Sequence, residues 1–338
     1  MIMTIEAPEK ALVLTPPCHK VMRAAHQNIL SQVSALKLDF LPVMKEKMRP
    51  LQAALTSADK AYHHELATLT AQLNNVNLQV IDLKQQQIEA DKRLSDKQRQ
   101  QAISLLNGQR IRQVSNLTES VRKSARTLVE RSDDMTQIHL TLEGNRLQET
   151  LQQQIDSMTE RSAGLESAMS AIAEDRRLLD ATIKAFEKYR LADQFKEMLP
   201  TPEELRLVTL PSPELALVTA GIARLGNLLG KISSALTYLD LTEERDRLRS
   251  RYNALLDQTR TITREARETK AKLDELTGLA QIDESKALWV KEARKVYQSL
   301  YNFLDQIASQ PDSSALISQH VEHLKAYIKS FYDVTRAL

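Results

Sequence analysis

The sequence predicts an all-α protein: an elongated rod of long antiparallel coiled-coil helices with a helical-bundle tail and an apolar tip. Turn-forming residues are scarce, with 7 Gly and 10 Pro in 338 residues, and no proline occurs between Leu51 and Leu199. Aromatic residues (1 Trp, 8 Tyr and 5 Phe) are few for a compact core of this size. Residue types typical of long helices and coiled coils, such as Ala, Leu, Glu, Lys and Gln, are abundant instead.

The N-terminal elements are expected to be short. Residues 1–19 contain three prolines and should be irregular. From about Lys20 to Phe40, apolar residues recur at steps of three and four, which predicts an amphipathic helix. Pro42 and Pro50 are expected to interrupt or kink this helix.

Residues 51–107 carry a longer apolar repeat that predicts a coiled-coil helix. Its seam positions alternate steps of three and four, at Leu66, Leu69, Leu73, Val76, Val80 and Leu83. Asn107-Gly108 is the strongest turn signal in the first half of the chain and predicts a reversal.

A second long helix is predicted across residues 110–198, with a shift of register near Gly144. Its seam residues include Val114, Leu117, Val121, Leu128, Met135, Ile138, Leu142, Ile155, Leu179, Ile183 and Phe186. At ~1.5 Å per residue, such a helix would extend about 130 Å, which predicts a rod or stalk. The pattern leaves open whether the two long helices pair within one chain or between chains.

The composition changes after residue 199. Four prolines break the helix within fourteen residues, at Pro200, Pro202, Pro211 and Pro213. The segment LALVTAGIARLGNLLGKISSALTYLDL (215–241) follows, and it holds three of the seven glycines. A charged helix resumes from about Glu243, and the last fifty residues hold half of the aromatic residues.

These changes predict four regions along the chain. The regions are an irregular N-terminus (1–19), tail and stalk helices (20–199), a membrane-active tip (200–242), and a return stalk helix with an aromatic-rich tail bundle (243–338).

As one helix, residues 215–239 would measure about 37 Å, enough to cross a hydrocarbon core of ~30 Å. Its broad apolar face would hold the candidate membrane-inserting residues Leu215, Leu217, Val218, Ile222, Leu225, Leu228, Leu229, Ile232, Leu236 and Leu239. The opposite face would carry the candidate pore-lumen residues Arg224, Asn227, Lys231 and Ser234.

The two cations weigh against an ordinary transmembrane helix. Arg224 and Lys231 would each cost about 2.5–3.5 kcal/mol facing lipid, but in a ring of subunits they could face a water-filled lumen. The alternative is a helix whose apolar face is buried against the stalk. Candidate hinges favour a conditional membrane segment: Pro200, Pro202, Pro211, Pro213, Gly221, Gly226 and Gly230.

Other classes of function have little support in the sequence. The net charge is only +2, and the basic stretch 84–131 lacks interleaved aromatics, so no nucleic-acid partner is expected. No phosphate-binding or nucleophile motif is present, so we expect no catalytic residues, no cofactor and no small-molecule substrate. His63-His64-Glu65, His320 with His323, and Cys18-His19 are read as surface or loop residues, with no metal site.

The long helices 51–107 and 110–198, the break 200–213, the segment 215–241 and the return helix from Glu243 together resemble a known family. The chain resembles the B component of binary α-helical pore-forming toxins of the alpha-xenorhabdolysin type, which are related in fold to cytolysin A. The resemblance covers nearly the whole chain and depends on architecture, without a short diagnostic motif.

This resemblance implies a protein that is monomeric in solution and assembles with an A-type partner on a target-cell lipid membrane. The resulting ring of heterodimers would insert residues 200–241, with Pro211, Pro213 and Gly221 as hinges. No ordinary signal peptide is visible, so the protein either stays in the cytoplasm or leaves the cell by another route, and the resemblance implies secretion. The competing interpretation is a structural or tethering coiled-coil protein, in which 215–241 is a buried or oligomer-contact helix.

Overall fold

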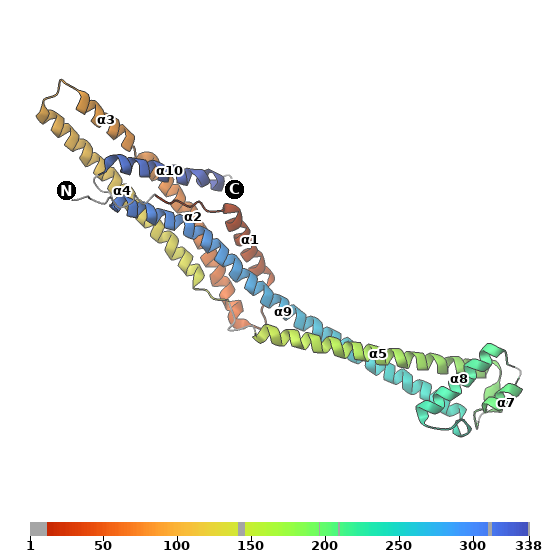
Figure 1. Ribbon diagram of the computed structural model, residues 1–338. Coiled ribbons are helices and arrows are strands. Elements are labelled where there is room, and N and C mark those ends of the chain that lie inside the picture. Colours follow the sequence, from red (N-terminus) through yellow and green to blue (C-terminus); the bar gives the residue numbers. More distant parts are fainter. Residues whose placement is uncertain (1–11, 141–145, 196, 209, 310–312, 337–338) are drawn as a thin grey trace, which may run out of the picture. The chain divides into compact units, whose positions relative to one another are not determined.

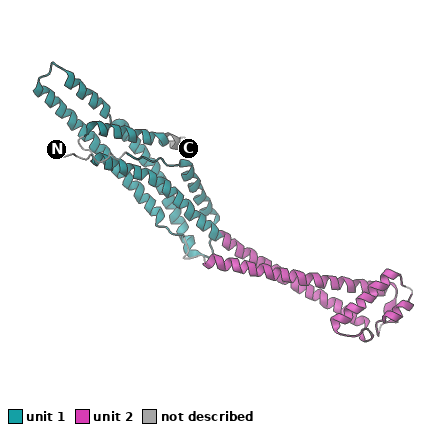
Figure 2. Ribbon diagram, in the orientation of Figure 1, with its two compact units in different colours: residues 1–144, 275–338 teal, residues 145–274 magenta. Residues whose placement is uncertain are grey.

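The computed structural model describes residues 12–140, 146–195, 197–208, 210–309 and 313–336 (Figure 1). All regular elements in these residues are helices, which confirms the predicted all-α class. They divide into two compact units: unit 1 comprises residues 1–144 and 275–338, and unit 2 comprises residues 145–274 (Figure 2). The long helix α9 (Tyr238–Ser309) contributes to both units.

Unit 1 is built from helices that are far apart in the sequence. It contains α1 (His19–Ala35), α2 (Pro42–Asn75), α3 (Leu78–Ala90), α4 (Asp96–Thr136), α10 (Ser314–Arg336) and the part of α9 beyond residue 274. Helix α2 packs along α4, and α10 lies against α2. The long helices of the first half therefore pair within one chain.

The core of unit 1 follows the apolar periodicity of these helices. Met22, Ala25 and Ile29 form the buried face of α1, at the spacing that the sequence predicts. Three large aromatic side chains, Tyr62, Trp289 and Phe303, are almost completely buried. Burial of such side chains contributes much of the stabilisation of a helical bundle.

The predicted coiled-coil seam ends earlier than the pattern indicated. Leu66, Leu69, Leu73 and Val76 are buried, but Val80 and Leu83 are exposed. The reason is local: α2 ends at Asn75, and the Asn77 side chain accepts a hydrogen bond from the Val80 amide to start α3. The intervening residues are extended, so the register of α2 does not continue into α3.

The reversal predicted at Asn107-Gly108 is wrong, because both residues lie inside α4. The chain turns instead between α3 and α4, where Ser95 and Gln98 form a reciprocal capping box. A glycine inside a helix costs only ~1 kcal/mol relative to alanine, and the well-capped helix tolerates it.

The helical pattern is interrupted before Pro42 as predicted: α1 ends at Ala35, and Pro42 occupies the first turn of α2, where a missing N–H costs nothing. Pro50 lies inside α2 and does not end it. The single helix predicted over 110–198 is two helices, α4 ending at Thr136 and α5 (Arg146–Lys188). The predicted shift near Gly144 lies outside the described residues.

Unit 2 consists of a helical pair and a set of short elements at one end of it. Helix α5 runs antiparallel to the first part of α9 (Figure 1). Met169 contacts Thr259, and Arg176 stacks on the ring of Tyr252. The residue numbers therefore increase along α5 while those of the contacting residues on α9 decrease, as antiparallel helices require. The short elements are α6 (Leu191–Gln194), α7 (Pro202–Leu207), α8 (Ser212–Leu229) and the 3₁₀ turn η1 (Ser233–Ala235).

Candidate membrane-contacting tip

The tip of unit 2, defined here as residues 197–241, is organised by prolines and caps at the starts of its helices. Pro202 occupies the first turn of α7, where Thr201 and Glu204 form a capping box. Pro211 precedes α8, and Pro213 lies in its first turn. These candidate hinges therefore lie at junctions between elements, where a change of backbone direction disturbs the fewest helical hydrogen bonds.

The segment 215–239 is not the single helix that the sequence predicted. Helix α8 ends at Leu229, and Gly230 follows in the left-handed conformation, with φ of 64°. The amides of Gly230 and Lys231 both donate to the Gly226 carbonyl, which closes the end of the helix. The return helix α9 then starts at Tyr238, earlier than the predicted Glu243. Among the described residues, no helix is both long and apolar enough to span a membrane.

The apolar face of α8 is docked on α5. Val218, Ile222 and Leu225 are buried in a cluster with Leu179 and Phe186 of α5. Other candidate membrane-inserting residues are partly buried against this cluster: Leu215, Leu217, Leu228 and Leu229. Leu236, which follows η1, is also buried, and its carbonyl accepts a hydrogen bond from the Leu199 amide at 2.7 Å.

Helices α8 and α5 approach each other closely at Gly221. A Cβ atom at Gly221 would overlap Oγ1 of Thr182, a side chain that is fully buried. Thr182 Oγ1 is held in place by donating to the Leu178 carbonyl of its own helix. The absence of a side chain at residue 221 is therefore what lets the two helices pack at this separation.

The two cations of the segment are both paired in this conformation. Arg224 of α8 donates to both carboxylate oxygens of Asp175 on α5, at 2.7 Å and 2.8 Å, and this bond raises the pKa of Arg224. Lys231 donates to Asp240 at 2.9 Å, and this contact, with the Thr237 amide, lowers the pKa of Asp240. The other two candidate lumen residues, Asn227 and Ser234, are exposed.

Several apolar side chains of the tip face solvent. Leu207 is 87% exposed, Ile232 is 73% exposed and Leu239 is 63% exposed, and Met198 is also exposed. Among the described residues of unit 2, these are the exposed large apolar side chains. A hollow of about 270 Å³ also lies between α7 and α8, lined by Leu205, Ile222 and Gly226 among others. The tip therefore combines imperfect packing with exposed apolar surface, which is unusual for an ordinary solvated loop.

The other candidates from the sequence are dispersed. Cys18 is exposed at the start of α1, whereas the His19 ring turns to the Tyr62 hydroxyl, 2.9 Å away. Glu65 is buried and accepts a hydrogen bond from Ser124 of α4, so it does not join His63. His320 and His323 lie on α10, and no metal-binding group of three ligands occurs in the described part of the chain.

The residues that hold α8 in place, Asp175, Thr182 and Asp240, were missed by reasoning from the sequence. Asp175 lies in a charged stretch of α5 that has no distinguishing pattern. The available signal was Gly221, because an isolated glycine in a helical pattern often marks a close approach of another element.

Comparison with known proteins gives a result only at the level of structure. No protein-family model matches the chain, and no curated protein matches its sequence. PaxB from Photorhabdus luminescens matches with a TM-score of 0.84 and 19% identity, over 94% of this chain and 97% of PaxB. XaxB from Xenorhabdus nematophila matches with a TM-score of 0.69 and 18% identity, over 94% and 98%.

The chain has the fold of PaxB and XaxB. A chain of the XaxAB pore complex from Xenorhabdus nematophila also matches, with a TM-score of 0.56 and 21% identity, over 93% of this chain and 97% of that one. Coverage of 94% means that the match to PaxB includes residues of both units. The resemblance expected from the sequence is therefore confirmed for the fold.

Proposed function

We propose that this chain is a subunit of a pore-forming cytotoxin that assembles with an A-type partner on a target-cell membrane. In this proposal the tip inserts into the lipid, and the chain has no enzymatic role. The observation that carries the proposal is the tip itself: the exposed large apolar side chains of unit 2 lie in the segments before and after α8, whose own apolar face is buried on α5.

The contacts that hold α8 support a reversible docking. The apolar face of α8 packs on α5, one helix of the antiparallel pair of unit 2. The ion pair between Arg224 and Asp175 is partly exposed to solvent, since 43% of the Arg224 side chain is accessible. Release of α8 would free the apolar face for lipid, while Arg224 and Asn227 on its other side would face a water-filled lumen. Pro211, Pro213, Gly226 and Gly230 border α8 or close its end, where a hinge would act.

The structural comparisons support the same function. One of the matching structures is named as a pore complex, XaxAB, whose name indicates two components. Helix α2 pairs with α4 inside one chain, which argues against the coiled-coil scaffold. The apolar seam from Leu66 to Val76 is already buried and is therefore unavailable to another chain. We keep the predicted tip, residues 200–242, as the membrane-active region of this proposal.

The test is dye release from liposomes, with the protein alone and with an A-type partner. We expect release only when both are present. In a Cys18→Ser background, an environment-sensitive dye at Leu228→Cys should shift to a lipid-like emission during release. The same dye at Gln258→Cys, on an exposed position of α9, is the matched control and should not shift. Absence of release on several lipid mixtures, with a stable dimer or trimer in buffer, would favour the scaffold.

A further inference from the structure

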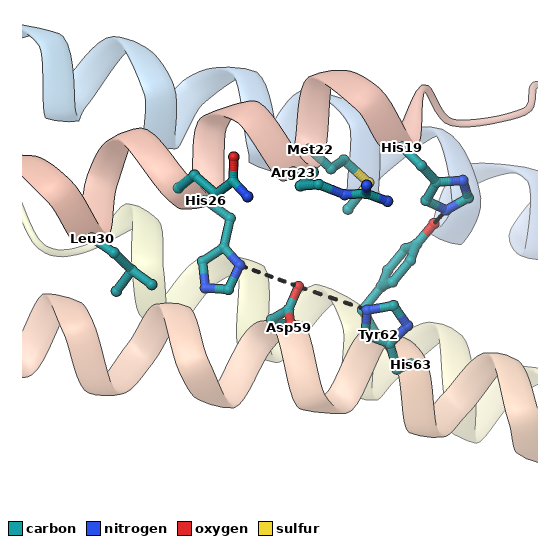
Figure 3. Close-up of a pocket in the computed structure, with 9 residues that line it drawn as sticks. His19, Met22, Arg23, His26, Leu30, Asp59, Tyr62 and His63 are labelled. Atoms are coloured by element: carbon teal, nitrogen blue, oxygen red, sulfur yellow. Dashed lines mark hydrogen bonds and ion pairs between the residues drawn. The ribbon is translucent and has the colours of Figure 1, made fainter. Parts of the chain in front are cut away.

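Titratable side chains line a cavity of about 380 Å³ between α1 and α2 in unit 1 (Figure 3). His19, Arg23 and His26 come from α1, and Asp59 and His63 come from α2. The cavity lining thus combines three imidazoles and a guanidinium with a single carboxylate. We call these five residues the histidine pocket.

The carboxylate of the histidine pocket lies between two of the imidazoles, as Figure 3 shows. Asp59 Oδ1 is 4.0 Å from Nδ1 of His26 and 3.9 Å from Nε2 of His63. These separations are too long for direct hydrogen bonds, so at neutral pH the pocket is held together without strong ion pairs.

His19 is the most constrained of the three histidines. Its Nε2 contacts the hydroxyl of Tyr62 at 2.9 Å, and its ring packs against Phe331 of α10. Tyr62 in turn packs edge-on against Trp289 of α9. The His19 imidazole thus connects α1 to α2, α9 and α10 through a buried aromatic cluster of Tyr62, Trp289 and Phe331.

Charged and titratable groups from every neighbouring element act on His19 or on its partner Tyr62. His63 of α2, Arg23 of α1 and Glu292 of α9 act on His19, and Tyr327 of α10, Glu292 and Asp59 of α2 act on Tyr62. Burial, followed by the charges of His63 and Arg23, lowers the pKa of His19, and Glu292 opposes this shift only in part. Glu292 is itself engaged by Lys295 and by the Cys18 amide.

The segment before α1 depends on the same helices. The Thr15 amide donates to Ser299 Oγ, the Thr15 carbonyl accepts from the Tyr327 hydroxyl, and the Cys18 amide donates to Glu292 at 2.7 Å. Residues 12–18 are therefore attached to unit 1 by a small number of polar bonds around the aromatic cluster, whereas the rest of α1 is held by its buried face of Met22, Ala25 and Ile29.

We propose that the histidine pocket is an acid-sensitive clasp, which holds residues 12–18 and the start of α1 on unit 1 at neutral pH and releases them in mild acid. A protonated His19 would place a charge against Tyr62, Trp289 and Phe331, and the nearby cations would repel it. Undocked His19 regains an ordinary pKa near 6.5, so docking is stable above that pH and weakens as the pH falls below it. This inference goes beyond the proposed function and does not depend on it.

The chain carries a natural pair of probes for the test. Cys18 is its single cysteine and is exposed, and Trp289 is its single tryptophan and is buried one helical turn from Glu292. A bimane dye on Cys18 should be quenched by Trp289 at pH 8, and should brighten reversibly as the pH falls from 7 to 5. Far-UV circular dichroism should stay nearly constant, because only residues 12–18 and the start of α1 leave their site.

Three variants separate the clasp from general acid effects. His19→Gln keeps a polar partner for Tyr62 but cannot be protonated, so the brightening should disappear. Arg23→Gln, at an exposed position, removes a charge that repels protonated His19, so the transition should move to lower pH. His64→Gln, on an exposed residue of α2 outside the pocket, is the matched control and should titrate like the wild type.

Three results would overturn the proposal. They are no brightening down to pH 5, an unchanged transition in His19→Gln, or a simultaneous loss of helical signal that reports global unfolding. If His19→Gln does not fold, an unshifted midpoint in Arg23→Gln would overturn it as well.

Discussion

Arg224 on α8 and Asp175 on α5 share two parallel hydrogen bonds, from Nε to Oδ1 and from Nη2 to Oδ2, across 49 positions of sequence. This bidentate geometry is the strongest form of a carboxylate–guanidinium pair. It fixes the rotation of α8 about its axis, so that Val218 and Leu225 face α5 while Asn227 faces solvent. The pair thus couples the electrostatics of the tip to the burial of its apolar face.

Asp175→Asn should loosen the docking of α8 while leaving Arg224 in place. The partly exposed pair is worth about 1 kcal/mol, so hydrogen exchange of the α8 amides should accelerate about fivefold. If α8 inserts as proposed, dye release with the A-type partner should also start sooner. Arg177→Gln, which removes the exposed pair with Glu174 on the same helix, is the control and should leave exchange in α8 unchanged.

Gly221→Ala should destabilise the tip, because the new methyl group would overlap the Thr182 side chain. Overpacking of this kind typically costs about 1–3 kcal/mol. Thermal unfolding followed by circular dichroism measures the loss. Thr182→Ala in the same chain should recover part of it, since Oγ1 is the atom in closest conflict.

A matched glycine distinguishes this packing effect from helix propensity. Gly164 of α5 has no atom within 4 Å of the position of a Cβ, so Gly164→Ala should stabilise the helix by about 0.5–1 kcal/mol. Equal effects of the two substitutions would contradict the close approach of α8 to α5.

The sequence predicted the helical class and much of the core, because three- and four-residue spacing is a direct consequence of helical geometry. Leu66, Leu69 and Leu73 are buried as their spacing indicated. The same spacing could not reveal the break at Asn77. There the Asn77 side chain caps the start of α3, and the apolar register of α2 does not continue into this new helix. Periodicity reports the face of a residue only while the helix is continuous.

The tip shows the same limit more sharply. The amphipathic pattern correctly grouped Val218, Ile222 and Leu225 on one buried face. The glycine-ended turn at Gly230 could have been read as a helix stop, but the apolar pattern continued through Ile232 and concealed it. The partners of the two cations, Asp175 and Asp240, depend on packing that no local pattern encodes.

Gly108→Ala tests the corrected interpretation of the Asn107-Gly108 dipeptide. Gly108 lies inside α4, and nothing lies within 4 Å of the position of its missing Cβ. Alanine should therefore stabilise unit 1 by about 0.5–1 kcal/mol, measured as a rise in the urea midpoint at constant slope. In a tight turn with a left-handed glycine, the same change would lower the midpoint.

Unit 1 should lose stability in strong alkali because two of its tyrosines are buried. Burial raises the pKa of Tyr327 to about 12 and places that of Tyr62 well above its usual value near 10. A raised pKa in the folded state means that the stabilisation is complete below pH 10 and is lost as the pH rises toward 12. For Tyr327 alone, the loss is on the order of 2–3 kcal/mol.

Absorbance at 295 nm follows tyrosinate formation and measures the ionisation of the eight tyrosines of the chain directly. Tyr327→Phe should remove one late-titrating group, and it should also free Thr15, whose carbonyl accepts the Tyr327 hydroxyl. Tyr301→Phe, at an exposed position, is the control and should leave the alkaline unfolding midpoint unchanged. Identical titration curves for the two variants would show that Tyr327 is accessible to solvent, against its burial on α10 next to Thr15.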